Sequence, residues 1–315
     1  MTRALPAAAA RFGPSSRRLV ILAVALAAGL CACGQAPPVP ELPHFATAPM
    51  RIVPASSAAV DMVCALVVPE RIAGLPAQAA DYSGLGARGA EGEAYLRRPQ
   101  FQAYAAEPLL ALSPDLVLAD NWQLADTTAR LREAGVPVVA LTSLESLADV
   151  RETFLVLGRL LGVEERARAE VAALDVRVTA LAAGAERRRG HSALAYSNGG
   201  AGGWVAGAGT AADEWIRLAG LTNAAADRVG HQRCSFEELL AMDPDLLVVS
   251  GPATFDRKGA TESLLRAEPA LAGLRALSGR HLIVLPAWLY DTVSQHVVTA
   301  AEALARGADV ALGSP

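Results

Sequence analysis

Short apolar runs rich in Val, Ile and Leu alternate along this chain with longer segments whose apolar residues recur at helical spacing. This alternation is typical of parallel strands joined by helical crossovers, because parallel strands cannot be connected by a tight turn. The first set of expected strands is 51–54, 71–75, 115–119 and 136–141, with helices near 57–67, 107–112 and 127–134 and a long one starting near Leu144. The second set has strands at 193–196, 246–249 and 282–285 and helices near 211–219, 236–241, 261–267 and 296–306. Two α/β lobes are therefore predicted.

The segment 164–189 separates the two sets and has no strand pattern. It is rich in Ala, Glu and Arg, and its apolar residues, including Leu174 and Leu181, recur at helical spacing. A continuous helix of about 25 residues spans about 37 Å at a rise of 1.5 Å per residue. We therefore expect one backbone helix that runs along both lobes and joins them rigidly.

A partial internal repeat supports two lobes. The segment EPLLALSPDLVL, which begins at Glu107, is similar to EELLAMDPDLLV, which begins at Glu237. In each segment a proline, Pro114 or Pro244, stops a short helix, and an Asp follows at the turn into a strand. The two lobes are thus expected to contain the same supersecondary unit.

The N-terminus has the organisation of an export signal. An apolar run of about a dozen residues (19–30) follows three arginines and is shorter than the roughly 20 residues that span a bilayer. The segment LCACG at 30–34 is similar to a bacterial lipobox with Cys33 as the lipidated residue, and the alternative is a plain secretory signal cut near Ala32. We expect residues 1–32 to be a lipoprotein signal peptide and the Pro- and Ala-rich residues 33–49 to be a flexible tether.

Charge, cysteines and motifs exclude several function classes. Without residues 1–32, which contain four Arg and no acidic residue, the net charge changes from −4 to −8, so no nucleic-acid partner is expected. Cys64 and Cys234 are more consistent with separate thiols than with a disulfide, and no Cys-x-x-Cys pair is present. Gly-x-Ser-x-Gly and His-Glu-x-x-His are also absent. A binding protein is favoured over an enzyme, and the alternatives are a secreted α/β hydrolase and a non-transport surface lipoprotein.

Several segments together resemble the class III periplasmic substrate-binding proteins of ABC importers for ferric siderophores, vitamin B12 and haem. They are RIVPASSAAVD from Arg51, RIAGL from Arg71, LALSPDLVL from Leu110, GVPVV from Gly135, GTAAD from Gly209, AGLTNAAAD from Ala219 and PDLLVV from Pro244. The resemblance runs from about Arg51 to Arg306. It implies two Rossmann-like lobes joined by one long backbone helix, with the ligand cleft between the lobes. It also implies a metal chelate as ligand, namely a ferric siderophore, cobalamin or haem, and no covalently bound cofactor.

The resemblance also implies how the chain is organised and what it meets. The expected divisions are an N-terminal lobe at 50–163, the linking helix at 164–189 and a C-terminal lobe at 190–315. We expect a monomer in the periplasm or cell envelope, anchored to the membrane through its lipid, that delivers the chelate to an ABC permease and its ATPase. In the family an acidic residue on each lobe docks onto the permease, and the matching positions are Glu107 and Glu237. Ordinary solvated helix-start glutamates are the alternative, and Glu238 competes in the second lobe.

Aromatic residues are scarce, at 5% of the chain, and several follow expected strands. Ligands of open parallel sheets bind beyond the carboxyl ends of the strands, and aromatic rings offer rigid contact area to a flat ligand. Tyr82 and Tyr196 are also candidates for axial ligands of haem iron, with simple hydrogen bonding as the alternative. The expected aromatic ligand-binding residues are Tyr82, Trp122, Tyr196, Trp204, Trp288 and Tyr290.

Histidines are too few in the expected cleft to bind a bare metal ion. A zinc or manganese site would need about three His with a carboxylate, whereas of the five His only His231 lies near the expected cleft. His231 is therefore predicted to contact the ligand, and no protein metal site is expected. The Gly-rich segment 199–210 is expected to be a loop beside the cleft that ends in Thr210 as a helix N-cap. Which chelate is bound stays open at this point.

Overall fold

Parallel strands form the centre of each lobe in the computed structural model, which describes residues 43, 45–120, 123–141, 144–200, 202–252, 260–277 and 279–313. In the N-terminal lobe, β1 (Ile52–Pro54), β4 (Leu116–Asp120) and β5 (Val138–Leu141) pair in the order β1-β4-β5. Both pairings are parallel, with Ile52 opposite Leu116 and Val117 opposite Val138. Two shorter strands, β2 (Leu75–Pro76) and β3 (Gln100–Phe101), form a separate parallel pair.

The C-terminal sheet has six strands in a mixed arrangement. Strands β6 (Ser192–Asn198), β8 (Thr222–Asn223), β10 (Leu246–Ser250) and β11 (Leu282–Leu285) are parallel. Strands β7 (Gly203–Ala206) and β9 (His231–Cys234) extend the sheet antiparallel, in the order β11-β10-β6-β7-β9. The expectation of a loop at 199–210 is therefore wrong in part, because the segment contains β7; Thr210 does cap the next helix, as predicted.

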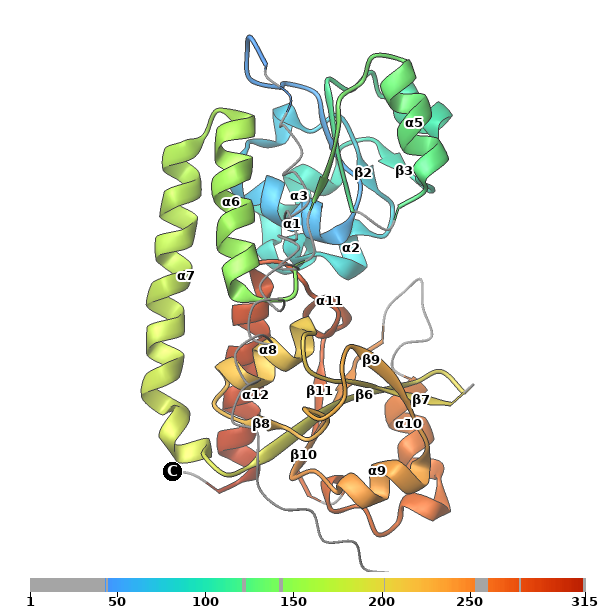
Figure 1. The fold of residues 1–315 in the computed structure, drawn as a ribbon, viewed down its shortest axis with the longest axis vertical. Coiled ribbons are helices and arrows are strands. Elements are labelled where there is room, and N and C mark those ends of the chain that lie inside the picture. Colours follow the sequence, from blue (N-terminus) through green and yellow to red (C-terminus); the bar gives the residue numbers. More distant parts are fainter. Residues whose placement is uncertain are drawn as a thin grey trace, which may run out of the picture. The chain divides into compact units, whose positions relative to one another are not determined.

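Helices cover the sheets of both lobes (Figure 1). The N-terminal lobe contains α1 (Ser57–Leu66), α2 (Ala79–Tyr82), α3 (Gly89–Leu96), α4 (Ala106–Ala111) and α5 (Ala125–Glu133). The C-terminal lobe contains α8 (Ala211–Leu218), α9 (Phe236–Met242), α10 (Ala260–Ala267), α11 (Ala287–Tyr290) and α12 (His296–Ala311).

One expected strand is wrong. Residues 71–75 were predicted to be a strand, but Pro69–Arg71 is a 3₁₀ turn, Ile72 forms only an isolated parallel bridge with Ile52, and a regular strand begins at Leu75. The physical reason is the long-range role of Arg71, whose buried guanidinium donates to the carbonyl oxygens of Pro49 (2.6 and 2.9 Å) and Leu161 (2.9 Å). These contacts hold the segment in a turn beside the linking helices.

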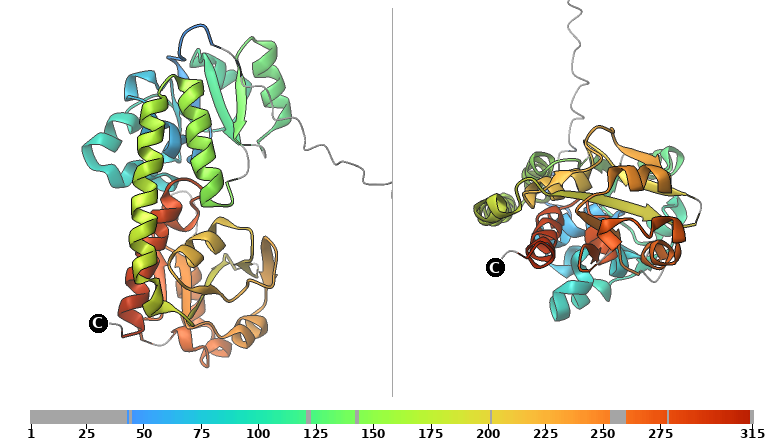
Figure 2. Two further views of the ribbon diagram at one scale, coloured as in Figure 1. Left: turned by 60° about the vertical axis from the view of Figure 1, so that its left-hand side comes forward. Right: turned by 90° about the horizontal axis from the view of Figure 1, so that it is seen from below.

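A helical pair connects the lobes. Helix α6 (Leu147–Leu161) ends at Gly162, whose φ of 67° only glycine adopts freely, and α7 (Glu164–Ala185) starts at the residue that the sequence predicts. Helix α7 contacts α1 of the first lobe and both α8 and α12 of the second (Figures 1 and 2). Among the described residues, no helix is both long and apolar enough to cross a membrane.

Apolar packing makes the connection between the lobes stiff. The largest buried cluster includes Ile52 and Met62 of the first lobe, Phe154 of α6, and Trp215 and Leu304 of the second lobe. Burial of apolar surface stabilises by about 25 cal/mol per Å². An ion pair adds to it, since Arg177 on α7 donates to Glu302 on α12 at 2.7 and 2.8 Å.

The repeated segments fold into matching turns. Ser113 (φ 48°) and Asp243 (φ 36°) follow α4 and α9, and within the described ranges no other non-glycine residue has a left-handed backbone. An arginine holds each turn, because Arg51 donates to the Ser113 carbonyl (2.7 Å) and Arg275 donates to the Asp243 carbonyl (2.8 Å). Left-handed conformations of such residues cost about 1–3 kcal/mol and persist where neighbours over-determine them.

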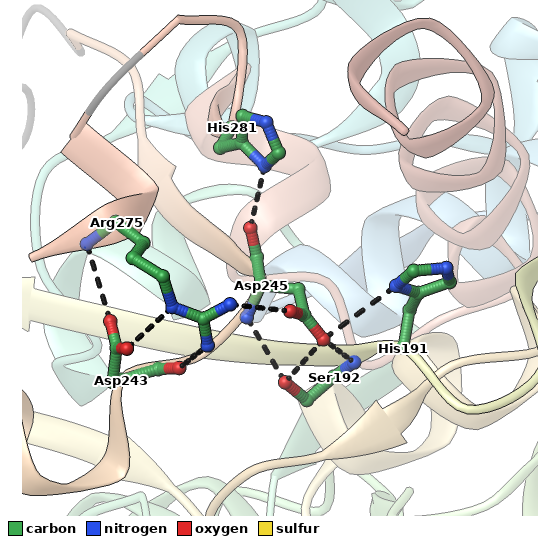
Figure 3. A network of polar contacts seen from close by, with 6 residues as sticks. All are labelled: His191, Ser192, Asp243, Asp245, Arg275 and His281. Atoms are coloured by element: carbon green, nitrogen blue, oxygen red, sulfur yellow. Dashed lines mark hydrogen bonds and ion pairs between the residues drawn. The ribbon is translucent and has the colours of Figure 1, made fainter. Parts of the chain in front are cut away.

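The aspartate after each turn ties two strands together. Asp115 accepts the N–H of Arg51 (3.0 Å) before β1, and Asp245 accepts the N–H (2.8 Å) and hydroxyl (3.1 Å) of Ser192 at the start of β6 (Figure 3). Burial acts to raise the pKa of the Asp245 carboxyl. The hydrogen bonds from Ser192 and the charges of Arg275 and His191 outweigh burial and hold the pKa below its usual value. The repeat predicted from the sequence thus has the same structural role in both lobes, which is to join a helix-ending turn to a neighbouring strand.

Candidate functional site

A hollow of about 350 Å³ lies at the carboxyl ends of the N-terminal strands, and we call it the N-hollow. Ala55 follows β1, Tyr104 follows β3 and Gln123 follows β4. Gln123 is held inside the lobe, because its amide donates to the Ala55 carbonyl (2.7 Å) and accepts the Asp120 N–H (3.1 Å). The described residues that line the N-hollow are uncharged at pH 7: Ala55, Gln78, Phe101, Gln102, Ala103, Tyr104, Gln123 and Leu124.

A second hollow, of about 250 Å³, lies at the carboxyl ends of the C-terminal strands, and we call it the C-hollow. Ser197 lies near the end of β6, Ser250 ends β10, and Tyr290 follows β11. The remaining lining residues come from β7, β9, α10 and the residue after α11: Trp204, Val205, Ala206, His231, Thr261 and Asp291. Three of the residues expected to bind the ligand, namely Trp204, His231 and Tyr290, are therefore brought together here.

The β7–β9 pairing sets the position of Trp204. Register places Trp204 opposite Arg233, and the guanidinium carbon lies 5.2 Å from the centroid of the indole ring. A cation over an aromatic face at this distance stabilises by about 0.5–1 kcal/mol at an exposed site. The indole is 40% exposed, so it presents a large ring at the rim of the C-hollow and remains free to contact a ligand.

The Tyr290 phenol gives the C-hollow a neutral hydroxyl. Burial raises its pKa, the Asp291 carboxylate raises it further, and a hydrogen bond with Ser197 opposes both. The Tyr290 ring also packs against Trp215, with centroids 6.4 Å apart. At pH 7 the phenol can therefore exchange hydrogen bonds with a ligand while its ring stays fixed.

Each hollow lies beside one of the two helices at which the lobes meet, since Gln78 of the N-hollow precedes α2 and Tyr290 of the C-hollow is on α11. Helix α2 follows β2 in the first lobe, α11 follows β11 in the second, and these two helices contact each other. The strand order in the C-terminal sheet places β6 between the parallel strand β10 and the antiparallel strand β7. Carboxyl ends of parallel strands are the common ligand position in open α/β sheets.

Tyr196 does not lie where the sequence led us to expect it. It belongs to β6 and not to a loop after a strand, and its side chain is 0% exposed, in the core behind the sheet. Asn198 donates to its hydroxyl at 3.0 Å, and burial raises the pKa of the phenol. The expectation that Tyr196 contacts a ligand, or binds haem iron, is contradicted by this burial.

Tyr82 and Trp288 lie on the two helices that form the junction between the lobes. Tyr82 ends α2, and Trp288 is on α11 with its ring edge-on to His296, at 5.0 Å between centroids. Neither of them lines the N-hollow or the C-hollow. Trp122 lies outside the described residues, so its place in the site stays a prediction, and the same holds for Cys33.

The expected docking glutamates are in the first turns of the repeated helices. Glu107 on α4 and Glu237 on α9 are both exposed. Glu238, the competing residue, accepts the Ser235 N–H (2.8 Å) and pairs with Arg228 (3.0 Å). Glu237 is also engaged, because hydrogen bonds with its own backbone N–H and with the Ser235 side chain lower the pKa of its carboxyl. The choice between the two residues and the docking role stay predictions.

Sequence reasoning missed several polar residues of both hollows. Gln78, Gln102 and Tyr104 follow strands of only two residues, which are too short to give a periodic signal. Ser197 is the neighbour of Tyr196 in β6, and successive strand residues face opposite sides, so choosing Tyr196 meant choosing the wrong face. The alternation of side chains along a strand shows that Tyr196 and Ser197 face opposite sides, but it does not say which side faces the hollow.

No metal centre is apparent in the part of the chain that the structure describes. Groups of three or more His, Cys, Asp or Glu with suitable positions are absent from these residues. In the C-hollow the other polar or aromatic lining residues beside His231 are Trp204, Asp291 and four residues with hydroxyl groups. The described lining residues of the two hollows therefore offer aromatic rings, hydroxyls, amides and the Asp291 carboxylate.

Three comparisons relate the chain to characterised proteins. A family model described as periplasmic binding protein matches residues 52–289. The cobalamin-binding protein of Halobacterium salinarum is 35% identical over 162 residues, which are 50% of this chain and 43% of that protein. The match thus spans less than half the length of this curated relative.

Solved structures resemble nearly all of the folded part. A periplasmic haem-binding protein from Pseudomonas aeruginosa has a TM-score of 0.71 and 25% identity, covering 84% of this chain and 94% of that one. An ABC-type Fe³⁺-hydroxamate transport system from Saccharomonospora viridis has a TM-score of 0.68 and 25% identity, with coverages of 84% and 94%. The names of these relatives describe binding or transport.

Proposed function

Because the chain belongs to the periplasmic binding protein family, we propose that it is the substrate-binding protein of an ABC importer for a metal chelate. It captures a corrinoid, a haem or a ferric siderophore between the N-hollow and the C-hollow and delivers it to a permease and its ATPase. The observation that carries the proposal is the convergence of Trp204, His231 and Tyr290 at the carboxyl ends of the C-terminal strands. The chelate is bound and released unchanged.

Cobalamin is the first ligand to test. The N-hollow offers the amides of Gln78 and Gln102 and no charged side chain among its described lining residues. Such a surface suits a ligand edge of neutral hydrogen-bonding groups, such as amides, better than one of carboxylates. The identity of 35% with a cobalamin-binding protein points in the same direction.

An absorbance titration of the purified protein tests the ligand class. Cyanocobalamin, haem and a ferric hydroxamate are titrated separately. One of them is expected to bind with a Kd below about 1 μM, which corresponds to a binding free energy of about −8 kcal/mol. Trp204→Ala is expected to weaken binding about tenfold, since an aromatic contact contributes on the order of 1 kcal/mol or more. Val176→Ala, a change at a more exposed apolar residue on α7, is the control and leaves the Kd unchanged.

Two outcomes would contradict the proposal. Binding of none of the three chelates in the micromolar range would favour a surface lipoprotein without a transport role. Chemical conversion of a bound ester or chelate, followed by mass spectrometry, would favour the secreted hydrolase.

Docking to the permease is tested in cells. Reversing both charges with Glu107→Arg and Glu237→Arg is expected to abolish chelate uptake while the purified variant keeps its Kd, because exposed charges steer and orient partners. Glu133→Arg, at another exposed acid of the first lobe, is the matched control. Undiminished uptake by the double variant would refute the docking role.

Export and anchoring are tested at the proposed lipidation residue. We infer that Cys33 carries the lipid, so Cys33→Ser is expected to move the protein from the membrane fraction to the soluble fraction of the envelope. A wild-type protein that is already soluble after cell fractionation would favour the plain secretory signal.

A further inference from the structure

A buried carboxylate accepts hydrogen bonds from both lobes at their junction. Asp61 on α1 is 3% exposed, and its two oxygens accept the N–H of Gly84 (2.7 Å) in its own lobe and the hydroxyl of Ser294 (2.8 Å) in the other. Gln295 donates its amide to the Asp61 carbonyl at 2.9 Å. Ser294 is completely buried. Neither hollow includes these residues, so ligand contact does not explain the cluster.

A histidine extends this cluster toward α11. The Nε2 atom of His296 lies 3.6 Å from an Asp61 oxygen, and its ring stands at 87° to the indole of Trp288 with centroids 5.0 Å apart. Gly84 makes room for the ring, because a Cβ atom at that position would lie 2.2 Å from Nε2. The Asp61 carboxylate thus lies next to the His296 ring, which in turn contacts the Trp288 ring, so the three side chains form a series of contacts across the junction.

The series ends beside the C-hollow. Trp288 and Tyr290 lie on the same short helix, α11, and Tyr290 lines the C-hollow. Helix α11 also contacts α2 of the first lobe and α12 of its own. A displacement of His296 would therefore move the helix that carries a lining residue.

We propose that Asp61 is a positioning residue for the ligand site, which through Ser294 and His296 holds α11 and the start of α12 against the N-terminal lobe. It fixes the separation between the N-hollow and the C-hollow before any ligand arrives. The part of the inference that concerns ligand affinity rests on the proposed function. The part that concerns the junction does not, and can be measured without a ligand.

The substitutions separate charge from hydrogen bonding. Asp61→Asn keeps an oxygen for the Gly84 N–H but removes the negative charge beside His296, whereas Asp61→Ala removes both. Asp115→Asn is the matched control, since Asp115 accepts backbone N–H groups of Met50 (2.7 Å) and Arg51 (3.0 Å) within one lobe.

Two ligand-free measurements on the full chain test the junction. Hydrogen exchange of peptides covering 79–88 and 287–298 is expected to accelerate about tenfold in Asp61→Ala, as for loss of a buried hydrogen bond. The control is expected to leave these peptides unchanged. Trp288 emission, isolated by subtracting the spectrum of Trp288→Phe, is expected to change equally in Asp61→Asn and His296→Gln, with no further change in the double variant. Unchanged exchange, or additive spectral changes, would overturn the positioning role.

A wedge at Gly84 provides an independent variant should Asp61→Ala fail to fold. Gly84→Ala is expected to push His296 aside and so change Trp288 emission. Normal emission from Gly84→Ala would contradict the contact.

Chelate affinity is then compared with these results. Asp61→Ala is expected to bind the chelate about tenfold more weakly, and Asp115→Asn to bind it normally. A normal chelate Kd in a variant with a loosened junction would overturn the positioning role. If the wild-type protein bound no chelate, the proposed function would fail while the ligand-free tests still decided on the junction.

Discussion

Replacing Tyr196 by Phe separates a core role from a ligand role at the residue where sequence and structure differ most. The change removes one hydroxyl and keeps the ring. In the structure this hydroxyl accepts a hydrogen bond from Asn198 (3.0 Å), and the side chain has no exposed surface. Asn198 is itself buried and accepts the Gly200 N–H at 2.9 Å.

The magnitude follows from the donor that the change leaves behind. Without the phenol oxygen, the Asn198 amide loses its acceptor in a buried position, which costs about 1–3 kcal/mol. Every 1.4 kcal/mol corresponds to about a tenfold change in the unfolding equilibrium constant. We therefore expect the urea midpoint of Tyr196→Phe to fall while its denaturant slope stays that of the wild type.

Chelate titration at low urea completes the test. The core role predicts an unchanged Kd, because the phenol does not reach either hollow. A Kd raised tenfold or more with an unchanged urea midpoint would refute the reasoning, since it would mean that the hydroxyl contacts the ligand and contributes little to the core.

Three further predictions concern packing, pH and thiol reactivity. Gly203→Ala should lower stability by about 1–3 kcal/mol in urea titrations, because its Cβ would lie 2.1 Å from a buried phenol oxygen, whereas Gly199→Ala, with open space around it, should not. The pKa of Asp245 is lower in the folded protein than in the unfolded chain, where it is about 3.9. The ionised carboxylate therefore stabilises the fold at pH values above about 3.9, and this contribution is lost as the pH falls through the folded pKa. Asp245→Asn should therefore destabilise at pH 7 and progressively less below pH 4, and a constant difference would contradict this. Burial raises the pKa of Cys234 to about 11 and that of Cys64 further, so both thiols should resist iodoacetamide at pH 8 until the protein is unfolded, and rapid labelling of native protein would exclude such burial.

Local patterns in the sequence were sufficient for much of the fold. The linking helix starts at Glu164, as its composition predicts, and the repeated Pro-Asp turns recur in both lobes. These features depend on neighbours in sequence, namely helical periodicity and the inability of proline to continue a helix. The same local logic identified Thr210 as an N-cap, with its hydroxyl accepting the Asp213 N–H at 3.1 Å.

The site depended on contacts between residues far apart in sequence. The two-residue strands β2 and β3 exist only because each pairs with the other, so the residues after them gave no signal as part of a hollow. Trp204 reached the rim through pairing with β9, about 30 positions later, which placed Arg233 over its ring. Asp61 and Ser294 form a hydrogen bond although 233 positions separate them in the sequence.

Tyr196 and Ser197 illustrate the division between sequence and tertiary structure. The sequence by itself determined that a strand would run through this segment of an α/β lobe, and it predicted a ligand site near the end of that strand. Only the tertiary structure decided which of the two neighbours faces the C-hollow, because adjacent strand residues point to opposite faces and packing on each side selects the buried one. The large ring fills the core, and the small hydroxyl lines the C-hollow.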